Sequence, residues 1–267
     1  MIAPEWDGYS RRAQYYAVEY QTNVDRPLLE GHVTSDVASI LEIPCGAGRN
    51  LAWLAGTGRF VLCADIEPAM IDVVEEEIGA LGVGDRVRAR VADMRILELG
   101  QTFDLVLVPQ EAMQLLAGPD DVARALRALA GSLAPGGTLV VDLFDFRAGG
   151  RAATSTLPDY YDPGRPDGVG IMDWTREADG GLHMTRVRRQ RPEPPVMHID
   201  YSYEVRDGNQ QVDAWCSTIA LHSYTQAEVT ELAGRAGLRV ERVLGDYEAN
   251  EAPPSAPRMI FVLRGAR

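Results

Sequence analysis

The sequence predicts an α/β fold in which a doubly wound parallel sheet carries an inserted antiparallel β lobe. Over residues 39–142, short and almost continuously apolar segments alternate with helical patterns, as expected for strands covered on both faces. Over residues 170–222, polar and apolar residues alternate between turn-forming sequences, which is typical of hairpins with one buried face. The first pattern then resumes at residue 223.

The core elements follow from local signals. Seven apolar segments are predicted strands: 39–43, 60–65, 87–91, 103–108, 138–142, 238–244 and 258–263. A helix is predicted after the glycine turn near residue 48, and another from Pro68, a favoured first helical residue, to about residue 81. A third, over 119–133, should end at the stop signal Pro135-Gly136-Gly137. Thr225 and Glu228 form a capping box that opens the last helix.

The N-terminal segment and the inserted lobe are the other two parts of the predicted organisation. A helix is predicted over residues 9–22, because four residues recur at helical spacing: Tyr9, Ala13, Tyr16 and Tyr20. The lobe contains four aromatic residues that would line a pocket, pack the sheet or stay exposed at a subunit contact: Trp174, Tyr201, Tyr203 and Trp215. We therefore expect an N-terminal helical lid (1–32), a core (33–146 and 223–267) and a β lobe (147–222).

Charge restricts the class of partner. The net charge is −13, so the chain is poorly suited to bind nucleic acid or an anionic membrane. Four arginines cluster in the lobe and are expected on a solvated face: Arg186, Arg188, Arg189 and Arg191. The chain has no lysine, which excludes a lysine base or Schiff base.

The cysteines and the hydropathy pattern predict a cytoplasmic protein. Cys45, Cys63 and Cys216 are scattered and odd in number, so they suggest neither a disulfide framework nor a zinc site. Neither a signal segment nor an apolar stretch long enough to span a membrane is recognised. We expect no metal.

The chemistry is expected at the carboxyl ends of the first three strands. Glu42-Ile-Pro-Cys-Gly46-Ala-Gly48 links the first strand to a helix, and its glycines allow a tight turn and close backbone approach to a ligand. Asp65 ends the second strand, where a carboxylate can accept hydrogen bonds from ribose hydroxyls. Asp93 follows the third strand. Glu42 would repel a pyrophosphate but could hold an ammonium group.

These residues together resemble the class I S-adenosylmethionine-dependent methyltransferases. The family's first motif reads acid-x-Gly-x-Gly-x-Gly, and here it runs from Glu42 to Gly48 with Pro44 in place of the first glycine. Asp65 matches the family's ribose-binding acid, and Asp93 with Met94 matches its acidic and apolar pair at the adenine edge. The resemblance implies a Rossmann-like, seven-stranded methyltransferase sheet.

The resemblance also implies the ligands and the residues that bind them. S-adenosylmethionine would be the cofactor and S-adenosylhomocysteine its product. Ten residues would bind it: Glu42, Pro44, Gly46, Gly48, Asp65, Ile66, Met70, Asp93, Met94 and Pro109. Four would serve catalysis or acceptor binding: Tyr9, Tyr16, Glu111 and Gln114. Other roles stay open, since Asp93 could cap a helix, the tyrosines could pack the core, and Glu111 could begin a solvated helix.

Within this family, the chain is similar to N-methyltransferases of amino sugars and related natural products, as in antibiotic biosynthesis. The resemblance implies a small-molecule acceptor, and a homo-oligomer is a further expectation. Residues 109–114 lack the signature of enzymes that methylate DNA bases or protein amides. An amine needs little beyond alignment for methyl transfer, which favours N-methylation. The alternatives are an O-methyltransferase using His222 as base, a nucleotide-binding oxidoreductase, and a binding module without activity.

Overall fold

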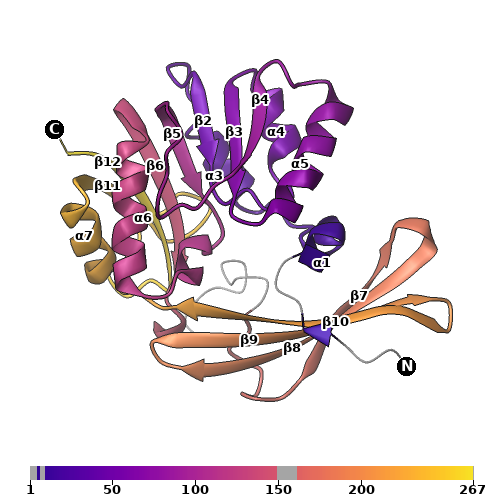
Figure 1. Ribbon diagram of the computed structural model, residues 1–267. Coiled ribbons are helices and arrows are strands. Elements are labelled where there is room, and N and C mark those ends of the chain that lie inside the picture. Colours follow the sequence, from indigo (N-terminus) through magenta and orange to yellow (C-terminus); the bar gives the residue numbers. More distant parts are fainter. Residues whose placement is uncertain (1–4, 7–9, 149–160, 267) are drawn as a thin grey trace.

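The computed structural model describes residues 5–6, 10–148 and 161–266 (Figure 1). Its main sheet has the strand order β11-β12-β6-β5-β2-β3-β4, and only β12 runs antiparallel to its neighbours. The strands are β2 (Ser39–Glu42), β3 (Phe60–Asp65), β4 (Val87–Val91), β5 (Phe103–Val108), β6 (Leu133–Phe144), β11 (Leu238–Leu244) and β12 (Arg258–Gly265). The predicted fold class is confirmed.

Helices cover both faces of this sheet, which explains why its central strands β2, β3 and β5 are mainly apolar. One face packs on α6 (Pro119–Gly131) and α7 (Gln226–Arg235). The other face packs on α3 (Arg26–Glu30), α4 (Leu51–Gly56) and α5 (Pro68–Leu81). The predicted capping box at the start of α7 is confirmed.

The predicted stop at Pro135-Gly136-Gly137 is wrong in one respect. The helix ends at Gly131, and β6 already begins at Leu133, so the motif lies inside the strand. The pairing of β5 with β6 shifts register between Phe103 and Leu105. A Cβ on Gly137 would lie 2.8 Å from the Phe103 carbonyl oxygen, so the motif provides an irregularity that lets two backbones approach.

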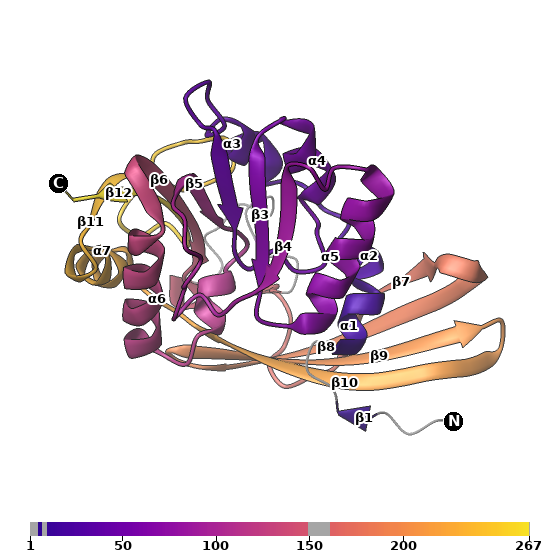
Figure 2. The same ribbon diagram turned by 45° about the horizontal axis from the view of Figure 1, so that its top comes forward.

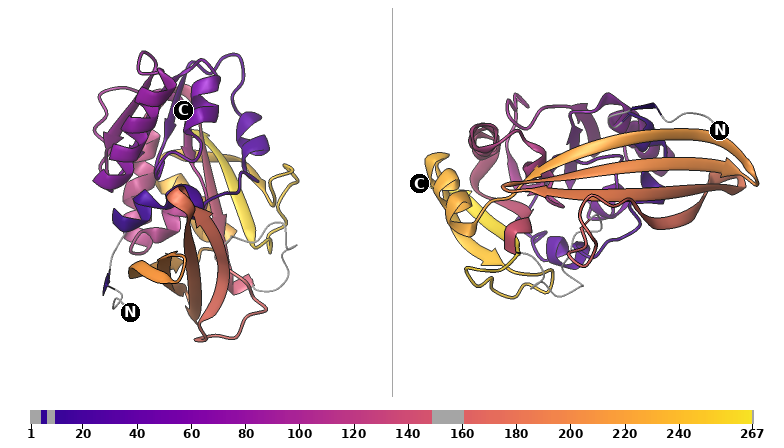
Figure 3. Two further views of the ribbon diagram at one scale, coloured as in Figure 1. Left: turned by 90° about the vertical axis from the view of Figure 1, so that its right-hand side faces the viewer. Right: turned by 90° about the horizontal axis from the view of Figure 1, so that it is seen from below.

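The inserted lobe is a separate curved sheet that crosses beneath the core (Figures 1 and 3). Its strand order is β1-β10-β9-β8-β7, with hairpin links from β7 to β10. The strands are β1 (Glu5–Trp6), β7 (Ile171–Ala178), β8 (Leu182–Glu193), β9 (Val196–Asp207) and β10 (Gln210–His222). The described residues also form the short 3-10 helices η1 (Ala112–Leu115), η2 (Phe146–Ala148) and η4 (Asp179–Gly181).

The N-terminal helix is interrupted, whereas the sequence predicts one continuous helix over residues 9–22. It is divided into α1 (Ser10–Gln14) and α2 (Tyr16–Glu19), which lie between the core and the lobe (Figure 2). The break is at Tyr15, whose ring stacks on Trp215 of the lobe at 5.3 Å. The next residue, Tyr16, contacts the glycine turn of the core instead. The interruption therefore occurs where two neighbouring side chains contact different parts of the molecule, Tyr15 the lobe and Tyr16 the core.

Three of the four lobe aromatics are buried, so of the roles left open by the sequence the structure supports sheet packing and not an exposed subunit contact. Tyr201, Tyr203 and Trp215 are at most 2% exposed, because the inner face of the lobe packs on the N-terminal segment. Trp174 is half-buried. Strand alternation indicates which residues share a face but not what covers that face.

The arginine cluster is also placed differently from the expectation. Arg186 and Arg188 are buried rather than solvated. Arg186 pairs with Glu19 at 2.9 Å and with Asp173 at 2.9 Å, and Arg188 pairs with Asp173 at 3.1 Å. Glu19 also accepts a hydrogen bond from Arg12, so it fastens the N-terminal helices to the lobe. Arg189 is exposed, in agreement with the expectation.

Candidate functional site

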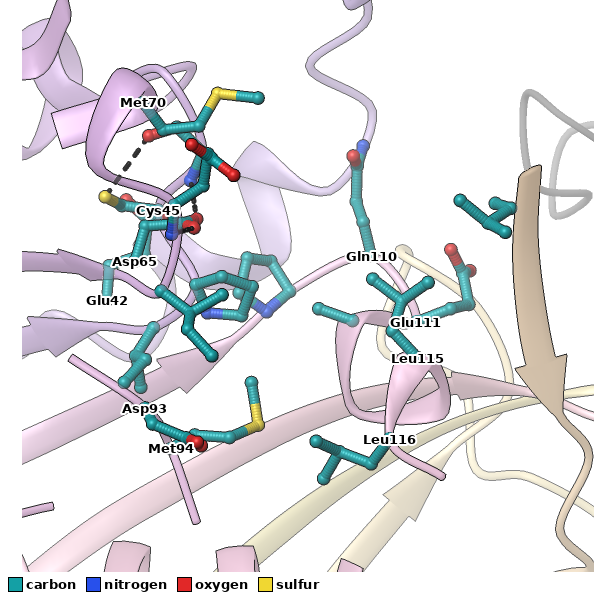
Figure 4. Close-up of a pocket in the computed structure, with 18 of the residues that line it drawn as sticks. Glu42, Cys45, Asp65, Met70, Asp93, Met94, Gln110, Glu111, Leu115 and Leu116 are labelled. Carbon is teal, nitrogen blue, oxygen red and sulfur yellow. Dashed lines mark hydrogen bonds between the residues drawn. The ribbon is translucent and has the colours of Figure 1, made fainter. Parts of the chain in front are cut away.

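A cavity of about 500 Å³ opens at the carboxyl ends of the core strands, where such sheets bind ligands (Figure 4). The core supplies one wall, the lobe strand β10 another, and Tyr16 and Tyr20 lie at its N-terminal side. Its lining comprises residues 42–46, 49, 65–67, 70, 92–95, 109–112, 115–117 and 218–221. One space therefore joins the predicted cofactor residues to the segment after β5.

Glu42 is the last residue of β2, and one of its carboxylate oxygens accepts no hydrogen bond from the protein. Its Oε1 accepts a hydrogen bond from Asn50 Nδ2 at 2.6 Å, while Oε2 is buried without a hydrogen-bond partner. Burial raises the pKa of Glu42 to about 7, although the Asn50 hydrogen bond acts in the opposite direction. A buried carboxylate oxygen of this kind suits a ligand ammonium group.

The glycine turn allows close approach of its backbone. Gly46 has a φ of +55°, and its amide donates to Asp65 Oδ2 at 2.9 Å. A Cβ at this position would lie 2.6 Å from Cζ of Tyr16, so only glycine fits beneath that ring. Gly48 differs from its expected role, since it does not line the cavity. Its φ of +87° shapes the turn, and a Cβ there would lie 3.3 Å from Cβ of Leu51.

Asp65 ends β3 with its carboxylate held by backbone. Oδ1 accepts from the amide of Glu67 and Oδ2 from that of Gly46, both at 2.9 Å. Burial raises its pKa, and the two amide hydrogen bonds act against that shift. The carboxylate is therefore held at the cavity wall, where its remaining lone pairs can accept further hydrogen bonds.

Apolar side chains surround this carboxylate. Ile66 is 58% exposed although it is large and apolar, and it lines the cavity together with Met70, Met94 and Pro44. These residues form an open apolar surface of the kind that a planar base can contact.

Asp93 lines the cavity and also makes local contacts. Its Oδ1 accepts from the Arg95 amide at 2.8 Å, and both oxygens receive hydrogen bonds from the Arg95 guanidinium. The Arg95 side-chain hydrogen bond holds the pKa of Asp93 below its usual range. Asp93 therefore both stabilises a local turn and lines the cavity.

Glu111 lies at the other end of the cavity, but not at a solvated helix start. It is 2% exposed, and its Oε1 lies 2.6 Å from Arg258 NH1. Gln110 and Glu111 both have left-handed backbone, with φ of 49° and 55°. Non-glycine residues seldom adopt that conformation, and strained positions gather at functional sites.

The other acceptor-side candidates are placed as follows. Gln114 is buried outside the cavity lining, where its Nε2 donates to the carbonyls of Phe144 and His222 at 2.9 and 2.7 Å. It therefore ties the core to the lobe rather than facing an acceptor. His222 does not line the cavity either. Tyr16 lines the cavity, whereas Tyr9 lies outside the described residues.

Several residues of the site were not singled out from the sequence. Arg49 and Asn50 directly follow the glycine turn, so their position was a usable signal. Arg49 pairs with Asp25 at 2.5 Å and lines the cavity. Residues 218–221 of β10 and Arg258 of β12 carried no local signal, because only folding brings them to the strand ends. No cluster of three potential metal ligands was found among the described residues.

Comparisons with known proteins agree with this geometry. Residues 40–137 match a family model described as a methyltransferase domain. The chain is 29% identical over 134 residues to the cypemycin N-terminal methyltransferase of a Streptomyces species, covering 49% of this chain and 53% of that protein. It is 24% identical over 208 residues to a dTDP-3-amino-3,6-dideoxy-alpha-D-glucopyranose N,N-dimethyltransferase of Streptomyces fradiae, covering 78% of this chain and 72% of that protein.

A solved structure shares the fold over nearly the whole length. It is an S-adenosylmethionine-dependent methyltransferase from Clostridium acetobutylicum, with a TM-score of 0.74 and 14% identity. The match covers 97% of this chain and 99% of the other. The residues of the cavity fit S-adenosylmethionine, because Glu42 offers a buried acceptor to its ammonium group and Asp65 offers one to its ribose.

Proposed function

We propose that this chain is an S-adenosylmethionine-dependent methyltransferase and that it methylates an amine nitrogen of a small molecule. The observation that carries the proposal is a single cavity with Glu42 and Asp65 at one end and the Glu111 carboxylate at the other. When bound, S-adenosylmethionine supplies an electrophilic methyl group. Two curated relatives are named as N-methylating enzymes of a peptide terminus and of an amino sugar.

The chain's own residues would act by holding and aligning the reactants. In-line alignment of two reactants can remove about 7–11 kcal/mol of a barrier. Glu42 and Asp65 would anchor the two ends of the adenosyl amino acid. Glu111 is near enough to the acceptor end to attract an ammonium group or to take its proton.

The setting of the reaction is part of the proposal. We propose a cytoplasmic reaction, in keeping with Cys45, Cys63 and Cys216, all of which are free thiols. Within the described part of the chain, none of the helices has the length and apolar character needed to span a membrane. A homo-oligomer stays a prediction, and the buried lobe aromatics no longer support it. The roles of the N-terminal segment as a lid and of the lobe in acceptor binding also stay predictions.

The proposal is tested with matched acceptors. Purified protein and S-adenosylmethionine are incubated with methyl glycosides of 3-amino-3,6-dideoxyglucose and of 6-deoxyglucose, which differ in one amine, and with a free and an N-acetylated peptide. Mass spectrometry should detect N-methylated products of the amines at rates at least about a hundredfold above those of the matched partners, since a neutral amine needs no base. Equal methylation of the hydroxyl compound would favour O-transfer. Tight binding of NAD without binding of S-adenosylhomocysteine would favour an oxidoreductase.

The affinity for S-adenosylhomocysteine should depend on pH through Glu42. Because burial raises the pKa of Glu42 to about 7, the carboxyl is increasingly protonated below that pH and cannot accept from the ligand ammonium. The affinity should fall about tenfold for each pH unit below about 7. Titration calorimetry over this range measures it, together with the proton release that accompanies binding.

The Glu42→Gln variant is the control for this titration. Its affinity should be low and nearly independent of pH, because glutamine does not ionise. The ligand-free protein should show the linked effect on stability: the contribution of Glu42 is expected to be present below its unfolded pKa of 4.5 and to be lost as the pH rises through about 7. A wild-type affinity that stays constant across this range would contradict the assignment.

A further inference from the structure

The lining of the cavity is strongly acidic. Five carboxylates and two guanidinium groups line it within the described residues: Glu42, Asp65, Glu67, Asp93 and Glu111, with Arg49 and Arg95. Both arginines already pair with carboxylates. Arg49 lies 2.5 Å from Asp25, and Arg95 lies 2.6 Å from Asp93 and 3.1 Å from Asp121. The space therefore favours a cationic ligand over an anionic one.

The acceptor end carries its own excess of negative charge. Arg258 NH1 lies 2.6 Å from Glu111 Oε1 and 2.5 Å from Asp142 Oδ1, so one buried guanidinium serves two buried carboxylates. Tyr247 donates to the other oxygen of Asp142 at 2.7 Å. A ligand ammonium beside Glu111 would balance this cluster without removing any of its internal contacts.

The backbone holds Glu111 in place for such a contact. Its left-handed conformation is closed by two backbone hydrogen bonds, from its amide to the Asp142 carbonyl at 3.2 Å and from the Gln114 amide to its own carbonyl at 2.8 Å. Figure 4 shows Glu111 and Gln110 on the loop that faces the glycine turn across the cavity. The carboxylate is therefore positioned before any acceptor arrives.

Apart from Gln110 and Thr218, the remaining surface at this end is apolar. Leu115, Leu116 and Ala117 follow Glu111 along the chain, and Ile219 and Leu221 of β10 line the same cavity. Leu115 is 40% exposed, which is unusual for a large apolar residue unless a ligand or partner covers it. The acceptor end thus combines one carboxylate with an apolar wall.

We propose that the acceptor is an amine with an apolar body, bound as an ammonium ion against Glu111, and that it carries no phosphate. This inference rests on the proposed N-methylation and narrows its substrate class. A diphosphate, as in the dTDP-linked acceptor named for one relative, would meet the Glu111 carboxylate at this end, and both guanidinium groups of the described lining already pair with carboxylates. A free amine, as at the peptide terminus named for the other relative, meets the favourable charge.

The test measures binding to the protein saturated with S-adenosylhomocysteine. Calorimetry compares cyclohexylmethylamine, cyclohexylmethanol and cyclohexanecarboxylate, which have similar shape and charges of +1, 0 and −1, and adds dTDP as the diphosphate probe. We expect the amine to bind at least about tenfold more tightly than the alcohol, with the carboxylate and dTDP weaker still. Glu111→Gln should reduce the difference between amine and alcohol to less than about threefold.

A matched variant separates this contact from a general change of charge. Asp120→Asn removes a carboxylate from the exposed start of α6 and should preserve the preference for the amine. Both variants should bind S-adenosylhomocysteine as the wild type does. Equal binding of amine and alcohol, no binding of the amine, or dTDP binding as tight as the amine would each overturn the inference while N-methylation could still hold. Loss of S-adenosylhomocysteine binding by the wild type would overturn the proposed function itself.

Discussion

Replacing Asp65 with alanine should lower the affinity for S-adenosylhomocysteine by about a hundredfold or more. The carboxylate lines the cavity and is oriented by the amides of Gly46 and Glu67. Two hydrogen bonds from ribose hydroxyls to a charged acceptor are worth about 1.5–3 kcal/mol each, or about 3 kcal/mol together at the lower limit. Titration calorimetry measures the loss directly.

Two further variants make this measurement specific. Asp65→Asn keeps the shape and one acceptor for the Gly46 amide, so it should retain the turn while still losing most of the affinity. Asp72→Ala removes an exposed carboxylate from α5 and should leave the affinity within about twofold of the wild type. An Asp65→Ala protein that is folded, as judged by its circular dichroism, and binds as tightly as Asp72→Ala would refute the assignment of Asp65.

Replacing Arg258 with methionine should produce the largest loss of stability. Arg258 is 1% exposed, and it pairs with Glu111 and Asp142, which would remain buried without their cation. Removing one partner from a buried ion pair costs about 3–5 kcal/mol. The free energy of unfolding, measured with urea at neutral pH, should fall by about this amount.

The loss of stability caused by Arg258→Met should be smaller at acidic pH. Burial raises the pKa of Asp142 even with Arg258 present, and since the arginine charge lowers that pKa, Asp142 would titrate at higher pH still without it. The stability that protonation provides is present at low pH and is lost as the pH rises through the folded pKa. The difference between variant and wild type should therefore be smaller near pH 5 than at neutral pH.

A surface variant provides the comparison. Arg239→Met replaces an exposed arginine on β11 and should change the free energy of unfolding by less than about 0.5 kcal/mol. The triple variant Glu111→Gln, Asp142→Asn, Arg258→Met removes the charges together and should recover part of the stability. If Arg258→Met were no less stable than Arg239→Met at either pH, the buried cluster would not contribute as described.

Much of the core could be predicted because its signals are local. A run of apolar residues between turn signals forms a strand wherever both faces are covered, and the segments from Ser39 to Val108 did so with nearly the predicted bounds. Nine of the ten predicted cofactor residues line the cavity, all except Gly48. Their positions follow from the rule that strand ends of a parallel sheet meet at one edge.

The sequence by itself thus determined the order of the core elements, the glycine turn and the acidic strand ends. Tertiary structure decided the environment of the charged and aromatic groups. The ion-pair partner of Glu111 is on β12, and β10 provides the cavity wall that belongs to the lobe. The hydrogen-bond acceptor of Tyr203 is on α2. The physical reason is that periodicity reports which side chains share a face, whereas burial and charge pairing depend on the distant segment that packs against that face.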